Sequence, residues 1–255
     1  KLTPKGEGNA TITVSQAGDA TYNAAPNKTF TVTVSENSPY SDSLSGMILW
    51  LDANDINGDG LPETSADFIS GGSSGVISNW ADRSGSSNNL TQSSATQMPS
   101  YTVVAGKPSV SFDGTNDSLS KSLPAALSGN PSFTILIAAK ASATSGRILH
   151  FGSNAGTANQ SLGLSAAGGF EYNAGSLSAF SNFSATPTTI GTFRRSSGSA
   201  QNKGEFYRNG EKLSLSAISA TGTLALPTSA SSLIIGKGIN SSGTNEVYSG
   251  KVNEL

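Results

Sequence analysis

A short acidic segment around residue 55 has the residue types and the spacing of a calcium-binding loop. Asp55, Asn57 and Asp59 occupy alternate positions, and Gly60 follows at the point where an EF-type loop turns sharply. Calcium is held by about six to eight hard oxygen ligands, which carboxylates, amides and backbone carbonyls supply. The segment therefore predicts a structural calcium site with a dissociation constant of about 10⁻⁴ to 10⁻³ M.

The ligands that complete this loop are left open by the sequence. The twelfth position, counted from Asp55, usually carries an acidic side chain, but here it is Ala66. The further candidate ligands are the backbone carbonyl of Leu61 and the side chains of Glu63, Asp67 and Asp52. The alternative interpretation is a pair of Asx turns that binds no metal.

Two further groups of residues are interpreted as structural. The turn from Asp113 to Asp117 has side chains that can accept hydrogen bonds from its own backbone, and this interpretation is favoured over a second metal site. Trp80 is a candidate for stacking on a sugar ring, but its apolar neighbours favour a place in the core. Both segments are therefore expected to support the fold.

The sequence lacks the side-chain sets that catalysis requires. It has no cysteine, a single histidine (His150) and no GxSxG motif. A glycosidase would need paired carboxylates that project from one sheet face. The glutamates in or near expected strands are isolated from one another, namely Glu171, Glu205, Glu211, Glu246 and Glu254. We therefore predict that the chain is not an enzyme.

The composition excludes several classes of partner. Charged residues make up 13% of the 255 residues, and the formal net charge is −2. This balance gives no electrostatic attraction for nucleic acid or for an anionic membrane. The longest apolar run, from Phe133 to Ala139, is far shorter than the ~20 residues that span a bilayer. Without cysteine, neither disulfides nor thiolate metal sites can form.

Apolar and polar residues alternate with a period of two in runs along the whole chain, and Gly, Pro, Asn and Ser bound these runs. This pattern predicts an all-β fold of two packed sheets. A type I′ hairpin turn is expected at Asn209-Gly210. The expected strands are residues 10–15, 28–35, 47–51, 109–113, 133–141, 147–151, 161–164, 170–172, 190–195, 204–208, 212–216, 223–226 and 232–236.

The alternation breaks between residues 37 and 45, where Pro, Ser and Asp indicate a linker. The preceding residues 1–36 hold only two good strands, which are too few to close a core, so this segment is expected to need a partner. Residues 46–255 are long enough for one large β-sandwich. The first residues have no apolar segment that would form a signal peptide, so the chain is expected to be a processed or internal piece of a longer protein.

The two parts of the chain resemble two different families. The run GNATITVSQAGDATYNAAPNKTFTVTVSE, at residues 8–36, resembles the last strands of immunoglobulin-like repeats in large bacterial surface proteins. This resemblance implies that residues 1–36 are the C-terminal strands of such a repeat. The neighbouring partners would then be further Ig-like repeats of the same polypeptide.

From residue 46 onward the chain resembles the laminin-G-like, concanavalin A-like jelly-roll domains of bacterial cell-surface proteins. The matching pieces are LWLDANDINGDGLPET, VISNWADRSGSSNNLTQ, KPSVSFDGTNDSLS, FYRNG and SSLIIGKG. The resemblance implies a two-sheet jelly-roll β-sandwich, and similar acidic loops in these relatives support calcium as a structural cofactor. Members of the family usually continue beyond a strand like VNEL, so the last strand is expected to be cut short here.

The resemblance implies a non-catalytic extracellular or cell-surface module of an adhesin-like protein. One hypothesis is that the jelly roll binds a glycan or another surface polymer. The alternative is a structural spacer or filament-forming domain without a ligand of its own. A polysaccharide lyase or glycosidase on the same fold is the third and least favoured hypothesis, since a fold alone does not determine function.

Overall fold

The structure is a computed structural model of the chain, and it contains two compact units. One unit contains residues 1–45 and 59–62, and the other contains residues 46–58 and 63–255. The structure describes residues 8–34, 45–61, 63, 75–104, 106–129, 131–142, 146–152, 159–165, 169–174, 177–181, 189–196, 204–214, 217–220, 231–239 and 245–255. The expected strand 223–226 and most of the expected linker 37–45 lie outside these residues.

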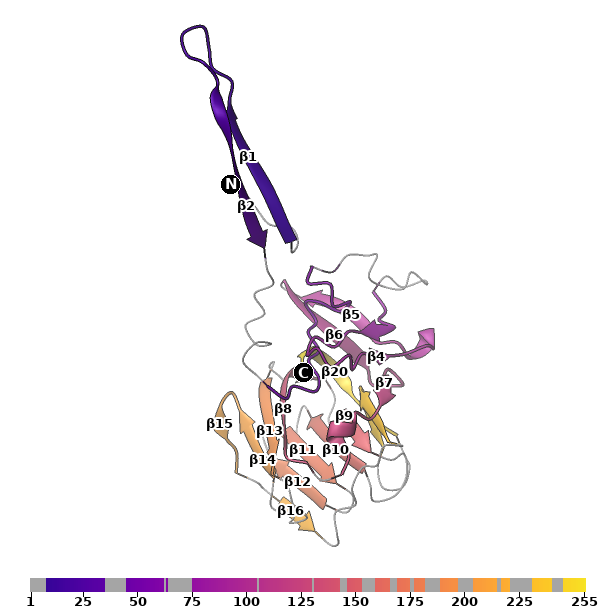
Figure 1. Ribbon diagram of the computed structural model, residues 1–255. Helices are drawn as coiled ribbons and strands as arrows, with labels where there is room; N and C mark the ends of the chain where they lie inside the picture. Colours follow the sequence, from indigo (N-terminus) through magenta and orange to yellow (C-terminus); the bar gives the residue numbers. More distant parts are fainter. Residues whose placement is uncertain are drawn as a thin grey trace. The chain divides into compact units, whose positions relative to one another are not determined.

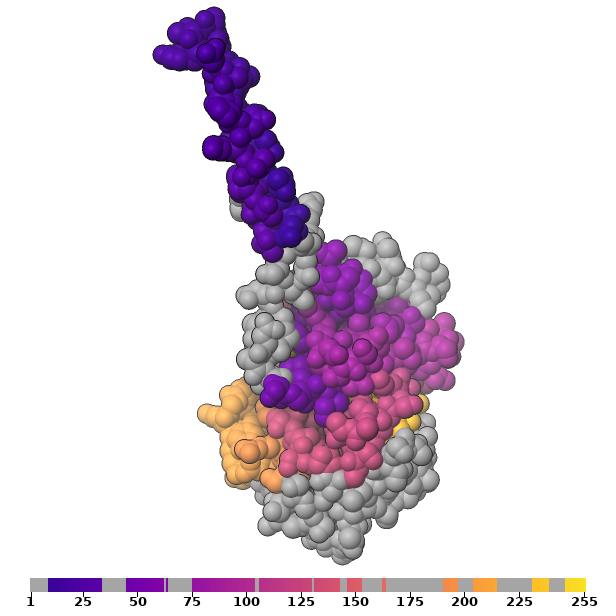
Figure 2. All heavy atoms as spheres, in the orientation of Figure 1, coloured from indigo at the N-terminus to yellow at the C-terminus, as the bar shows by residue number. Residues whose placement is uncertain are grey.

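The first unit contains one antiparallel hairpin, formed by β1 (Gly8–Gln16) and β2 (Ala25–Val34) (Figure 1). Ile12 lies opposite Phe30, so apolar side chains gather on one face of the hairpin. Phe30 is 49% exposed and Val14 is 56% exposed. Figure 2 shows the hairpin, coloured indigo, as a narrow rod of atoms. The hairpin therefore has no adequate core of its own. A lone two-stranded sheet of this kind is marginally stable in water.

The second unit contains two large sheets. The nine-stranded sheet has the order β16 (Ala217–Ala220), β12 (Leu177–Ser181), β11 (Gly169–Ala174), β10 (Asn159–Ser165), β9 (Arg147–Gly152), β17 (Ser232–Ile235), β7 (Leu119–Ser122), β4 (Leu90–Thr91) and β3 (Asn79–Trp80). The seven-stranded sheet has the order β15 (Glu211–Lys212), β14 (Gly204–Arg208), β13 (Thr189–Arg195), β8 (Phe133–Ala141), β20 (Ser249–Glu254), β6 (Lys107–Asp113) and β5 (Ser100–Val104). The central pairings of both sheets are antiparallel.

Three smaller elements complete the described part of the second unit. Strands β18 (Lys237–Ile239) and β19 (Asn245–Val247) form a two-stranded sheet. Two single 3-10 turns, η1 (Ala95–Gln97) and η2 (Ala125–Leu127), are the helical elements among the described residues. In that part of the chain no helix is long and apolar enough to cross a membrane.

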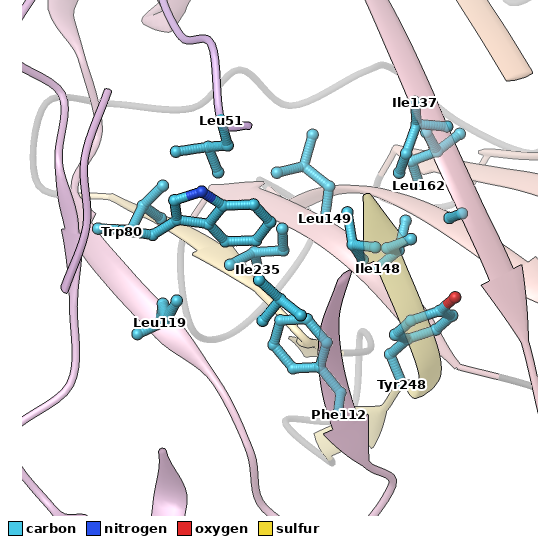
Figure 3. Close-up of a cluster of buried hydrophobic side chains, with 14 of the residues drawn as sticks. Leu51, Trp80, Phe112, Leu119, Ile137, Ile148, Leu149, Leu162, Ile235 and Tyr248 are labelled. Carbon is cyan, nitrogen blue, oxygen red and sulfur yellow. The ribbon is translucent and has the colours of Figure 1, made fainter. Parts of the chain in front are cut away.

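One apolar core joins the two large sheets. The seven-stranded sheet contributes Val110, Phe112, Ile137, Phe193 and Val252, and the nine-stranded sheet contributes Trp80, Leu119, Leu149, Phe151 and Ile235. Figure 3 shows the indole of Trp80 within this cluster, among Leu51, Leu119 and Ile235. The alternating sequence pattern explains this core, because successive side chains of a strand point to opposite faces. The predicted all-β, sandwich-like character is therefore confirmed.

Most expected strands recur with shifts of a few residues at their ends, and the Asn209-Gly210 turn is confirmed. Asn209 has φ 50° and Gly210 has φ 88°, which are the two positive values that a type I′ turn needs. Strand β14 ends at Arg208 and β15 begins at Glu211, so Asn209 and Gly210 alone form the loop. The dipeptide Asn209-Gly210 was therefore sufficient to predict this turn.

The expected strand at residues 47–51 is wrong. Leu51 instead exchanges two backbone hydrogen bonds with Leu255, at 2.7 and 3.0 Å, and Ala53 donates one to Asn253 at 2.9 Å. Only the isolated bridge between Asp52 and Glu254 is formed in this part of the described chain. The second unit thus pairs its first described residues with its last.

Side chains explain why no regular strand forms there. The Asp82 carboxylate accepts the N–H of Trp50 at 2.9 Å, and the Asn88 amide donates to the carbonyl of Ile48 at 2.6 Å. These backbone groups would otherwise be available to a strand ladder, and the side chains satisfy them instead. The apolar residues at 47–51 predicted a strand because they do not show that side chains far along the chain bind their backbone groups.

Candidate functional site

The predicted calcium loop begins at Asp55, whose side chain is buried. The residue is 2% exposed, and one carboxylate oxygen accepts the N–H of Gly58 at 2.8 Å. The other oxygen lies 2.8 Å from the guanidinium of Arg83. Asp52 lies 3.8 Å from the same guanidinium nitrogen. A buried carboxylate needs such a partner because desolvation of an unpaired charge is costly.

Arg83 is also fixed by contacts other than this ion pair. Its guanidinium carbon lies 5.0 Å from the ring centroid of Trp50, which is cation–π range. Its backbone N–H donates to the carbonyl of Trp50 at 2.8 Å. The indole N–H of Trp50 in turn donates to Glu254 at 3.1 Å. The guanidinium is therefore held in place on the Asp55 carboxylate.

The other predicted ligands have separate local partners. Asp59 is exposed and accepts the N–H of Leu61 at 2.8 Å, which is an Asx-type turn. Glu63 accepts the N–H groups of Ile56 and Asn57. Asp59 and Leu61 belong to the first unit, whereas Asp55, Asn57 and Glu63 belong to the second.

Of the two remaining candidate ligands, Asp67 and Asp52, the first lies outside the described residues. Asp52 accepts hydrogen bonds from the backbone and the side-chain amide of Asn54, at 2.8 and 2.7 Å. It therefore contributes to a turn of its own beside Arg83.

Among the described residues of this loop, the surroundings of Asp55 are unfavourable for a calcium ion. No group of three or more His, Cys, Asp or Glu side chains that could hold a metal occurs in the part of the chain that the structure describes. At Asp55 the guanidinium of Arg83 already supplies the positive charge. Calcium at this carboxylate would compete with Arg83 for its negative charge. Calcium binding stays a prediction, and the Asp55–Arg83 pair is the main argument against it.

Asp82 was expected to cap the turn at Ser84-Gly85 in an ion pair with Arg83. It does accept hydrogen bonds from Ser84, but Arg83 pairs with Asp55. The two carboxylate oxygens of Asp82 accept the N–H groups of Trp50, Ser84 and Asn88 at 2.8 to 2.9 Å. One carboxylate thus connects the turn after β3 to the segment before the Asp55 loop. The neighbouring Trp80 is 0% exposed, and its indole N–H donates to the carbonyl of Asp52 at 3.1 Å. It therefore belongs to the core, as the favoured interpretation expects.

His150 lies in β9 and is 0% exposed. Neither ring nitrogen has a hydrogen-bond partner among the described residues. Burial, with a smaller contribution from the charge of Arg147, lowers the pKa of His150 to about 4. In this position the imidazole is neutral at pH 7 and has no access to a substrate in solution.

The turn that follows β6 contains two carboxylates with opposite environments. Asp113 is exposed and accepts the N–H groups of Thr115 and Asn116 at 2.7 and 3.2 Å, which is the expected Asx turn. Asp117 is 8% exposed. Burial raises the pKa of Asp117 to about 6, against the hydrogen bond from the Asp113 N–H, and the charge of Asp113 adds to the rise.

His150 and Asp117 are expected to have opposite effects on stability in acid. The folded pKa of His150 lies below its unfolded value, so the unfolded chain binds more protons between pH 6.5 and 4. Acidification over that range therefore removes about 3 kcal/mol of stability through this residue. The folded pKa of Asp117 lies above its unfolded value, so protonation between about pH 6 and 3.8 restores a similar amount, about 3 kcal/mol.

Single variants should reveal these opposing contributions. His150→Leu is expected to gain stability relative to the wild type as the pH falls from 7 to 4.5, whereas Asp117→Asn is expected to lose it. Each change should amount to about 2 kcal/mol at pH 4.5. Urea denaturation at several pH values measures the free energy of unfolding of each protein. If this free energy changed with pH equally in the two variants and the wild type, the prediction would be contradicted. The exposed Lys28→Gln serves as a control with no expected slope change.

No family model matches this chain, and a comparison with curated proteins finds no match either. The assignment of function therefore rests on the residues themselves.

Proposed function

We propose that the chain is a non-catalytic extracellular module of an adhesin-like surface protein, and that its sandwich binds a glycan or another surface polymer. In this proposal the second unit is a laminin-G-like jelly roll, and the hairpin belongs to an Ig-like repeat. The main support is the outward face of the seven-stranded sheet, which presents hydroxyl groups together with exposed apolar side chains.

The composition of that face suits a carbohydrate. Its hydroxyl-bearing positions include Ser100, Ser111, Thr134 and Thr192, which alternate in their strands with buried or core-facing residues. Leu136 in β8 is 55% exposed and Ile190 in β13 is 52% exposed. Sugars combine hydroxyl groups with apolar C–H surfaces, so a face that offers both kinds of contact is complementary to them.

The placement of the described carboxylates supports a non-catalytic role. Glu246 lies 2.5 Å from Arg147, and Glu205 lies 2.5 Å from Lys212. Asp55 is paired with Arg83, and Glu254 accepts the indole N–H of Trp50. Each of these groups supports the fold, whereas a glycosidase would direct two carboxylates at one sugar bond.

The direct test is binding to polysaccharides. The whole chain is expected to bind at least one neutral or charged polysaccharide on a glycan array, and affinity electrophoresis should reproduce the binding without loss of the polymer. Release of reducing ends or unsaturated products from any such polymer would contradict the non-catalytic proposal. Failure to bind any polysaccharide would contradict the binding proposal.

A structural spacer is the second candidate, and the hairpin favours it. No residue from 9 to 33 is buried, and Tyr22 is 71% exposed. A hairpin with this much exposed apolar surface needs a covering layer to be stable. Self-association measured by analytical ultracentrifugation, together with an absence of polysaccharide binding, would favour the spacer.

A further inference from the structure

Two lysines lie directly opposite each other on the outward face of the seven-stranded sheet. In β8, Ala139 and Ala141 are buried while Lys140 is exposed, and in β20, Gly250 and Val252 are buried on either side of Lys251. Because side chains alternate along a strand, both lysines point away from the core. The antiparallel register pairs Lys140 with Lys251.

This arrangement is unfavourable for the isolated fold. Like charges directly opposite on neighbouring strands destabilise a sheet, and β8 and β20 are adjacent strands near the centre of the sheet order. Neither ammonium group forms an ion pair with any residue that the structure describes. A bound anion between the two lysines would relieve their repulsion.

Hydrogen-bond donors continue the row beyond the lysines. Ser111 of β6 lies opposite Lys251, and Ser100 of β5 lies opposite Ser111. The acidic residue of this face on β6, Asp113, is engaged with the backbone of its own turn at 2.7 and 3.2 Å. The row therefore offers two positive charges and two hydroxyl groups, which suits a carboxylate or a sulfate group.

An apolar and aromatic row starts further along β8 and continues onto β13 and β14, on the other side of β8 from β20. Leu136 lies opposite Thr192 of β13, and Thr192 lies opposite Tyr207 of β14. Leu136 and Lys140 are four residues apart on β8, which corresponds to about 14 Å along the strand. Glu205 beside Tyr207 is paired with Lys212, so it does not cancel the lysine pair. A ligand that spans both rows must be an extended chain with apolar and anionic groups.

We propose that this outward face, with Lys140 and Lys251 as its anion-binding centre, binds an acidic polysaccharide that carries carboxylate or sulfate groups. The proposal rests on the proposed glycan-binding function and adds the place and the charge of the ligand. The lysines contact the anionic groups, and Leu136, Ile190 and Tyr207 contact the apolar C–H faces of the sugar rings. Added salt weakens the binding because exposed charges are screened.

The test is the affinity of the whole chain for polygalacturonate, for chondroitin sulfate and for neutral dextran of similar length. In the double variant Lys140→Gln/Lys251→Gln, the affinity for the acidic polymers is expected to fall about tenfold or more, because charge-assisted contacts are lost. Thermal unfolding of this variant should be unchanged or occur at a higher temperature, since the repulsion is removed. The control Lys28→Gln/Lys237→Gln removes the same charge outside the seven-stranded sheet and is expected to change the affinity less than twofold.

Each other outcome is decisive. If the double variant keeps wild-type affinity for the acidic polymers, or if the chain binds only dextran, this inference is overturned while the glycan-binding function stands. If single-stranded DNA binds as tightly as polygalacturonate, the site is a nonspecific polyanion site and the inference is also overturned. If no polysaccharide binds, the proposed function itself fails.

Discussion

Replacement of Trp80 by alanine is expected to lower the free energy of unfolding of the second unit by about 3 to 5 kcal/mol. Trp80 is 0% exposed and lies in the core between the two large sheets. The substitution removes the apolar contacts of the indole and also the hydrogen bond to the carbonyl of Asp52, which is 3.1 Å long. Urea denaturation followed by far-ultraviolet circular dichroism measures the change without depending on tryptophan fluorescence.

Two companion variants separate a packing role from a ligand-binding role. Trp80→Phe should cost less than Trp80→Ala, because a ring still fills part of the space. Tyr22→Ala in the hairpin is expected to change the stability by less than about 0.5 kcal/mol, since Tyr22 is 71% exposed. If Trp80→Ala unfolded like the wild type but lost polysaccharide affinity, Trp80 would be a ligand contact and its placement in the core would be refuted.

Replacement of Arg83 by methionine is expected to cost about 3 to 5 kcal/mol. The variant keeps a long apolar side chain but leaves the buried Asp55 carboxylate without the guanidinium that lies 2.8 Å away. It also removes the cation–π contact with Trp50. Addition of Asp55→Asn should recover much of the loss, because the amide oxygen can still accept the N–H of Gly58 and no buried charge remains.

The same variant tests the calcium prediction. At 10 mM calcium and a dissociation constant of about 1 mM, binding would stabilise the fold by about 1.4 kcal/mol. This stabilisation should be larger in Arg83→Met than in the wild type, because the guanidinium no longer competes for Asp55. Thermal unfolding with calcium or with a chelator measures the difference. Equal responses of the two proteins to calcium would show that Arg83 does not compete with calcium for Asp55.

Local signals allowed much of the fold to be predicted. The turn at Asn209-Gly210 depends on two adjacent residues, and the strand at residues 133–141 has a long run of strand-forming residues with clear ends. Strands β3 and β4 have two residues each, which is too short for an alternating pattern to be visible. The segment at residues 47–51 was predicted wrongly because Asp82 and Asn88, far along the chain, satisfy its backbone.

The candidate sites were harder to predict than the strands. The acidic spacing around Asp55 was visible in the sequence, but its pairing with Arg83 depends on the fold of the second unit. Lys140 and Lys251 are 111 residues apart in the sequence, and only the register of β8 and β20 brings them together. Pairings of this kind are set by tertiary structure, so neither residue type nor spacing along the chain indicates them.

The backbone pairing of Leu51 with Leu255 is expected to affect how the second unit responds to mechanical load. The two segments are antiparallel, so tension applied from the side of Gly46 and from Leu255 acts at the same end of the pair. Such a load breaks the hydrogen bonds one after another, as in unzipping, and does not shear them all at once. In a chain under tension, the pairing of Leu51 with Leu255 would break first. Strand β20 would then separate from its neighbours β6 and β8.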